Sequence, residues 1–158
     1  MWRRLRSYAL AWAATAVALG ATTILLRHTE HPTLLASLGG SCVILFGMPG
    51  SEMARPRSLF GGHLVSSVMG LLCLHVLMPA FGGAPEAWMI GAVATALLIM
   101  MATDTIHSPA GANPVVIFIE GAGWSFLAWP LLVGLLVLFL TAFAAIRLGL
   151  VRPPPARG

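Results

Sequence analysis

Long runs without a charged residue constrain this chain more than any other feature. The stretches Tyr8–Leu26 and Leu127–Ile146 hold no charged residue, and each approaches the ~20 residues that cross a bilayer. Of the 158 residues, 58% are apolar and 9% are charged, which is too little charge for the surface of a water-soluble domain. The sequence therefore predicts an all-α polytopic membrane protein whose main partner is the lipid bilayer.

Six hydrophobic segments follow one another in what reads as a single transmembrane domain, residues 1–158. The four long segments are expected near 8–26, 62–78, 86–101 and 127–146, and the two short, broken ones near 34–48 and 114–121. Each half of the chain reads long, short, long. This order predicts a 3+3 inverted repeat, with repeat one at about 7–78, repeat two at about 86–147 and a tail at 148–158.

The second short segment is preceded by a strong helix-breaking stretch, Thr105–Pro114. Pro109 and Pro114 lack amide donors and resist a helix interior. The residues before them are pushed towards extended conformations, so we expect the helix to restart near Asn113 with Pro114 in its first turn. Non-helical backbone at membrane depth is tolerated only where protein buries it or where it lines a wet cavity.

Gly39-Gly40-Ser41 occupies the corresponding place in the first half and is expected to break that segment as well. Two half-helix starts near the midplane would offer unpaired N–H groups and partial positive charge to a small anion. The residues predicted to bind such a substrate are Gly39, Gly40, Ser41, Gly111, Ala112 and Asn113. The alternative is that both breaks are purely structural kinks.

Two ionisable residues, Asp104 and His107, lie before the second break and are candidates for proton coupling. No HExxH motif, phosphate-binding loop or paired-carboxylate arrangement occurs in the sequence. We therefore expect no enzyme activity, no catalytic residues, no metal site and no cofactor.

All nine basic residues are arginine, and they flank the apolar segments, which indicates membrane orientation rather than nucleic-acid binding. If the short segments cross the membrane, every arginine except Arg27 shares one side; if they are re-entrant, Arg55 and Arg57 join Arg27. The first arrangement predicts cytoplasmic termini in an inner or plasma membrane. Gly62, Ser66 and Gly70 form a small-residue face, expected to pack within the bundle, with a homo-oligomer contact as the alternative.

Two motifs in combination resemble the HPP family of integral membrane proteins. They are the run Pro56-Arg57 followed by Gly62-His63 and Ser66, and the run His107-Ser108-Pro109-Ala110-Gly111-Ala112-Asn113-Pro114. The chain departs from the family at Ser108, which replaces the first proline of His-Pro-Pro. The resemblance implies four membrane helices and small-anion transport, with nitrite as the favoured cargo. The predicted function is thus a transporter or channel for a small monovalent anion, and the alternative is a membrane scaffold or sensor subunit.

Overall fold

A computed structural model of the chain describes residues 2–151, and all regular structure in that range is helical. Four helical stretches are long and apolar enough to cross a membrane: Leu5–Leu25, Pro56–Phe81, Pro85–Ala102 and Trp124–Arg147. The stretch Leu34–Gly47 is a shorter apolar helix, and α6 has only eight residues. The predicted set of four long and two short segments is therefore confirmed.

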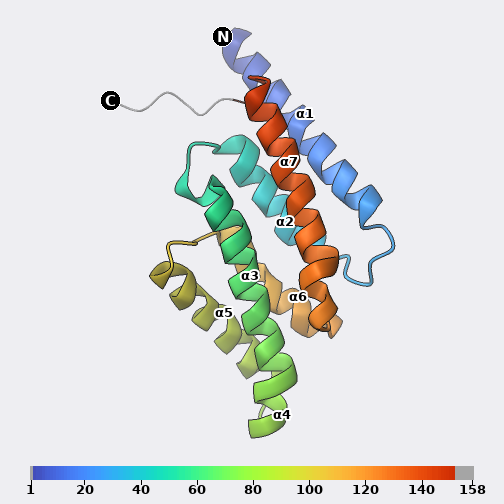
Figure 1. The fold of residues 1–158 in the computed structure, drawn as a ribbon, viewed down its shortest axis with the longest axis vertical. Coiled ribbons are helices and arrows are strands. Elements are labelled where there is room, and N and C mark those ends of the chain that lie inside the picture. Colours follow the sequence, from blue (N-terminus) through green and yellow to red (C-terminus); the bar gives the residue numbers. More distant parts are fainter. Residues whose placement is uncertain (1, 152–158) are drawn as a thin grey trace.

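Successive segments reverse direction along the bundle (Figure 1). The first half holds α1 (Trp2–Leu25), α2 (Leu34–Cys42) with its continuation η1 (Val43–Gly47), the turn η2 (Glu52–Ala54), and α3 (Pro56–Leu72), which continues through η3 (Cys73–Leu77) and α4 (Met78–Phe81). The second half holds α5 (Pro85–Ala102), η4 (Ser108–Ala112), α6 (Asn113–Glu120), η5 (Trp124–Leu127), η6 (Ala128–Leu132) and α7 (Val133–Arg147). A proline in the first turn starts each of α3, α5 and α6.

The reversals bring the start of α1, the end of α7 and the α2–α3 connection to one end of the bundle (Figure 1), here called the arginine end. Arg57 Nη2 donates to the Thr103 carbonyl at 2.6 Å, so the end of α5 lies there too. Arg27 follows α1 at the opposite end. The predicted tail residues Arg152 and Arg157 lie outside the described range. Whether the two short segments cross a membrane or re-enter stays a prediction, since four helical stretches are long enough to span.

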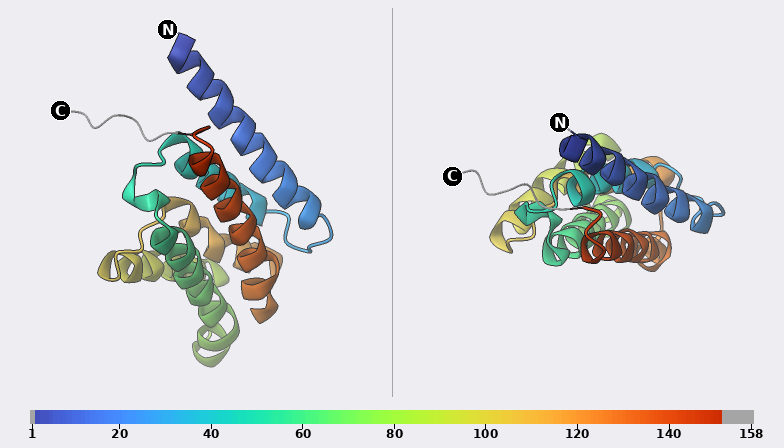
Figure 2. Two further views of the ribbon diagram at one scale, coloured as in Figure 1. Left: turned by 45° about the horizontal axis from the view of Figure 1, so that its top comes forward. Right: turned by 90° about the horizontal axis from the view of Figure 1, so that it is seen from above.

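The helix pairings correspond between the two halves. Helix α1 packs against α7 and α3 packs against α5, while α1 contacts α2 as α5 contacts α6 (Figures 1 and 2). These are the pairings that a two-fold relation between the halves would generate. The inverted repeat itself stays a prediction, since α3 also packs extensively on α6 whereas α7 contacts α2 less.

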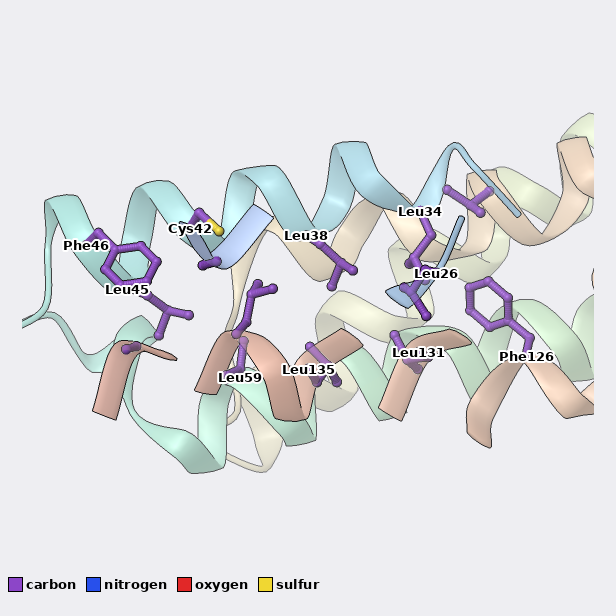
Figure 3. Close-up of a cluster of buried hydrophobic side chains, with 14 of the residues drawn as sticks. Leu26, Leu34, Leu38, Cys42, Leu45, Phe46, Leu59, Phe126, Leu131 and Leu135 are labelled. Carbon is purple, nitrogen blue, oxygen red and sulfur yellow. The ribbon is translucent and has the colours of Figure 1, made fainter. Parts of the chain in front are cut away.

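The main apolar core lies between α2, the start of α3 and the last segment, η6–α7 (Figure 3). Leu38, Leu59 and Leu135 meet there with at most 2% exposure. At the far end Phe126 is fully buried and its ring contacts the edge of His31, with ring centroids 5.3 Å apart. This core holds the first short helix against the last long one.

The first short segment differs from its prediction. Gly39, Gly40 and Ser41 do not break the chain, because helix runs without interruption from Leu34 to Gly47. Beyond the first turn of a helix, backbone N–H groups are paired with carbonyls of the preceding turn. The glycine amides are therefore not available as a half-helix start, which lies instead at Leu34.

The second short segment is broken as predicted. The chain leaves α5 at Ala102, passes Asp104 in a left-handed conformation (φ 51°) and is extended at His107. It then resumes as the 3-10 turn η4 and continues directly into α6 at Asn113. The helical restart thus begins about one turn earlier than expected, and the backbone N–H of Asn113 is already paired with the Ala110 carbonyl.

Candidate functional site

Helix α3 has glycine at two positions where the broken stretch lies against it, Gly62 and Gly70. A Cβ added at Gly62 would lie 2.7 Å from His107 Cβ and 2.8 Å from the Thr105 carbonyl oxygen. A Cβ at Gly70 would lie 2.9 Å from Pro114 Cα. Glycine at these two positions lets the backbone of the break approach α3 closely. The small-residue face therefore packs inside the bundle, as predicted.

A buried group of polar side chains lies where α2, α3 and the broken stretch meet. We call it the polar cluster; its members are Ser37, Ser41, His63, Ser67, His107 and Asn113, all with at most 2% exposure. The first two come from α2, the next two from α3, and the last two from the broken stretch and the start of α6. Both halves of the chain thus contribute to one site inside the bundle.

Asn113 is at the centre of the cluster. Its Oδ1 accepts from Ser37 Oγ at 2.8 Å, and its Nδ2 donates to Ser67 Oγ at 2.8 Å. The same Nδ2 lies 3.0 Å from His63 Nδ1. Because an amide nitrogen is only a donor, His63 Nδ1 is the acceptor in this contact. The side chain of Asn113 therefore joins all three elements of the site.

The two histidines are bridged by one hydroxyl. Ser41 Oγ lies 2.9 Å from His63 Nε2 and 2.9 Å from His107 Nε2, and the ring centroids are 5.1 Å apart. His107 Nδ1 lies 2.8 Å from the Met53 carbonyl, to which it must donate. With uncharged imidazoles, His63 Nε2–H donates to Ser41 Oγ. The Ser41 O–H has two acceptors within reach, His107 Nε2 at 2.9 Å and the Ser37 carbonyl at 3.1 Å, and only donation to the first supplies His107 Nε2 with a proton donor.

The cluster holds no carboxylate and no guanidinium among its members. Both imidazoles are fully buried, and burial without a charged partner favours their uncharged form. On α3 beside the cluster, the hydroxyl of Ser66 is fully buried and has no hydrogen-bond partner among the described residues. A buried hydroxyl that stays unpaired leaves hydrogen-bonding capacity for a guest molecule.

An open cavity of about 700 Å³ lies at the arginine end next to the cluster. Its lining residues are Glu52, Met53, Arg55, Arg57, Ser58, Asp104 and Ile106. Met53 belongs to both sites, because it lines the cavity and its carbonyl accepts from the buried His107. The Met53 peptide therefore links the cavity lining to the histidine pair.

At the opposite end, Glu120 closes the space between the two short helices. Its Oε2 lies 3.0 Å from His31 Nδ1, and its Oε1 accepts from the backbone N–H of Thr33 at 2.9 Å and from the Thr33 hydroxyl. A carboxylate beside the first turn of α2 satisfies free amides there and interacts favourably with the helix dipole. The end of α6 is thereby bound to the start of α2.

The structure brings together three of the predicted site residues, Ser41, His107 and Asn113. Gly40 faces Pro109, since an added Cβ would lie 3.1 Å from Pro109 Cβ, whereas Gly39 and Gly111 have open space around them. Ala112 is exposed. Asp104 is also exposed and lines the cavity rather than the cluster. The polar chemistry is therefore carried by side chains and not by the glycine amides.

Sequence reasoning missed His63, Ser37 and Ser67. In the sequence, His63 stands out only as part of a family motif, yet its side chain is fully buried. Its position relative to Ser66 and Ser67 held a usable signal, because residues at i, i+3 and i+4 share one helix face. A polar stripe of this kind on an apolar helix indicates an inward-facing site.

Comparison with known proteins agrees with this architecture. The family description "HPP, transmembrane region" matches residues 2–154. Two transmembrane proteins of Dictyostelium discoideum are similar, one 32% identical over 117 residues (72% of this chain, 41% of that protein) and one 33% identical over 113 residues (69% of this chain, 36% of that protein). The chain thus spans less than half the length of these relatives, and no solved structure matches it. The chain belongs to the HPP family of integral membrane proteins.

Proposed function

We propose that this protein transports a small monovalent anion, with nitrite as the favoured cargo, through the polar cluster. The observation that carries the proposal is a fully buried set of neutral donors at the junction of both halves of a membrane bundle. Intramembrane polar residues that face the bundle interior are costly and typically mark a substrate path. The nitrite assignment comes from the family resemblance.

Two further features support transport over a scaffold role. The unpaired hydroxyl of Ser66 adds donor capacity beside the cluster. The cavity at the arginine end gives an anion a nearby entrance, lined by the guanidinium groups of Arg55 and Arg57 and by the carboxylates of Glu52 and Asp104. Small uncharged donors bind an anion weakly enough to release it again. The described residues offer no enclosed carboxylate pair for catalysis, so transport fits the site better than an enzyme does.

Purified protein in proteoliposomes tests the proposal directly. We expect nitrite uptake above that of protein-free vesicles under an imposed voltage, a pH gradient or both. Folding is checked by thermal unfolding in the detergent used for reconstitution. Folded protein without uptake under any of these gradients would reject transport and leave the scaffold or sensor role.

Variants at Gly111 and Asn113 distinguish the two possible binding modes. If backbone amides near the start of α6 bind the anion, Gly111→Asp abolishes uptake while Gly111→Asn retains it; the open space at Gly111 accommodates either side chain. If the side chains of the cluster bind it, as we propose, Asn113→Asp abolishes uptake because an isosteric carboxylate repels the anion. Gly111→Asp would then retain a substantial part of the activity.

We further propose that the arginine end faces the cytoplasm of an inner or plasma membrane, since the excess of arginine favours that side. Single cysteines at Gly50 and at His28, in a background lacking Cys42 and Cys73, report on the two ends; both positions are exposed. An impermeant thiol reagent applied to right-side-out vesicles should label His28→Cys alone. Labelling of Gly50→Cys without lysis would reverse the orientation.

A further inference from the structure

We propose that His63, Ser41 and His107 form a proton relay that couples each anion to one proton, so that the protein is an electroneutral proton–anion symporter. The inference rests on the proposed function and adds a driving force and roles for two residues, His63 and Ser41. It follows from the direction of the hydrogen bonds, from the uncharged state of the cluster and from the contact with the cavity.

The first step is the need for positive charge. A monovalent anion inside a bundle of low polarity is costly to bury without a compensating charge. The cluster itself contains no permanent cation. The imidazoles of His63 and His107 are its only members that can become cationic. Protonation of the pair would supply charge when the anion is present and remove it when the anion leaves.

The second step is a continuous hydrogen-bonded path. The path starts from the arrangement described above, in which His63 carries its proton on Nε2. A proton that binds His63 Nδ1 allows the Nε2 proton to pass to Ser41 Oγ, and the hydroxyl proton of Ser41 then passes to His107 Nε2. His107 Nδ1–H, which now belongs to an imidazolium, is released to water that displaces the Met53 carbonyl from it. One proton enters, one leaves, and both rings change tautomer. A second transfer in the same direction requires both rings to regain their first tautomers. When the cluster is open to water on one side, each ring can lose one proton to that water and take one from it, which restores the first arrangement without moving a net proton.

The third step is control at the end of the path that lies next to Asn113. Asn113 Nδ2 donates a hydrogen bond to His63 Nδ1 at 3.0 Å, so this nitrogen cannot accept a proton until the amide turns away. An anion that takes over the donor groups of Asn113 would free His63 Nδ1. Binding of cargo and protonation of the pair therefore favour each other, which is the condition for coupling.

The surrounding titratable groups do not disturb this assignment. Glu52, Arg55, Arg57 and Asp104 belong to the cavity and are exposed; His31 and Glu120 lie at the opposite end; Cys42 is the buried titratable residue on α2 next to Ser41. None of the charged groups among them is hydrogen-bonded to either histidine of the pair.

Transport experiments on the full chain test the coupling. With the voltage clamped at zero, an inward proton gradient should drive nitrite accumulation, and a voltage without a proton gradient should not. Ser41→Ala should lower proton-driven uptake at least tenfold, because the hydroxyl bridge is lost. Cys42→Ala, a truncation at the neighbouring buried position, should keep the proton dependence, and Ser41→Cys should restore part of it and serves where Ser41→Ala does not fold.

Two results would overturn the relay while transport stands: uptake that follows voltage and ignores the proton gradient, or proton-driven uptake that is unchanged in Ser41→Ala. A readout independent of transport is nitrogen-15 NMR of histidine-labelled protein. The relay requires opposite tautomers, with the proton on Nε2 in His63 and on Nδ1 in His107. Identical tautomers would reject the relay whatever the transport result, and if no anion moves at all, the proposed function and the symport fail together.

Discussion

The two short helices begin in different surroundings although their sequences look alike. Helix α2 starts at one end of the bundle, where Glu120 satisfies its first turn, and its glycines lie in the helix interior. Helix α6 follows a true break, and its first residue, Asn113, is fully buried in the polar cluster. One difference is the pair of prolines at positions 109 and 114, since proline disfavours a helix interior whereas glycine is compatible with helix and with turn. Glycine-rich stretches in a membrane helix more often serve close packing.

The largest expected loss of stability comes from a side chain that keeps the broken stretch away from α3. Gly62→Ala places a Cβ against His107 Cβ and the Thr105 carbonyl, and overpacking of this kind costs about 3 kcal/mol. We expect a clear fall in the midpoint of thermal unfolding in detergent. Gly91→Ala, in the interior of α5 with nothing within 4 Å, is the matched control and should not lower it. Equal midpoints for the two variants would contradict the close approach.

The next effect tests the start of α6. Asn113→Ala removes one partner from Ser37, His63 and Ser67 at once and leaves buried polar groups unsatisfied, at a cost of about 2 kcal/mol. Thermal unfolding should show the loss. Thr22→Ala is the control, because Thr22 is equally buried but bonds only the Ala18 carbonyl of its own helix. A smaller loss for Asn113→Ala than for Thr22→Ala would mean that the cluster does not stabilise the fold.

Loss of the contacts at the start of α2 should lower the stability less. Glu120→Ala removes the acceptor for Thr33 and the partner of His31, at a cost of about 1 kcal/mol for a lost helix cap. Glu52→Ala is the control, since Glu52 pairs with Arg55 at 83% side-chain exposure and such pairs contribute little. The unfolding midpoints of the two variants should differ. If they coincide, Glu120 does not hold the two short helices together.

The smallest effect separates neighbouring glycines in α2. Gly39→Ala should raise stability by about 0.5 kcal/mol, because the position is helical and has open space. Gly40→Ala should gain less or lose slightly, since its Cβ would meet the Pro109 ring at 3.1 Å. Thermal unfolding compares the pair directly. A clear loss for Gly39→Ala would indicate that the segment is broken there after all.

Much of the fold was predictable because the physical signals are local. Length and hydropathy give the four long helices, and Pro109 and Pro114 give the break and the start of α6. The continuous helix through Gly39 was not predictable, because glycine is compatible with helix and with turn, and packing against the break decides between them. The partnership of Ser41 with His63 and His107 depends on residues 22 and 66 positions apart, which no local pattern reports.

The bonds between the two short helices also determine what moves as one body. Glu120 fastens the end of α6 to the start of α2, and Ser37 fastens the middle of α2 to Asn113. Two attachment points along one pair of helices remove most of their freedom to slide or rotate against each other. Any motion that opens the cluster to water must therefore carry α2 and α6 together, and it must break the bonds that Ser41 and Asn113 make to His63 and Ser67 on α3.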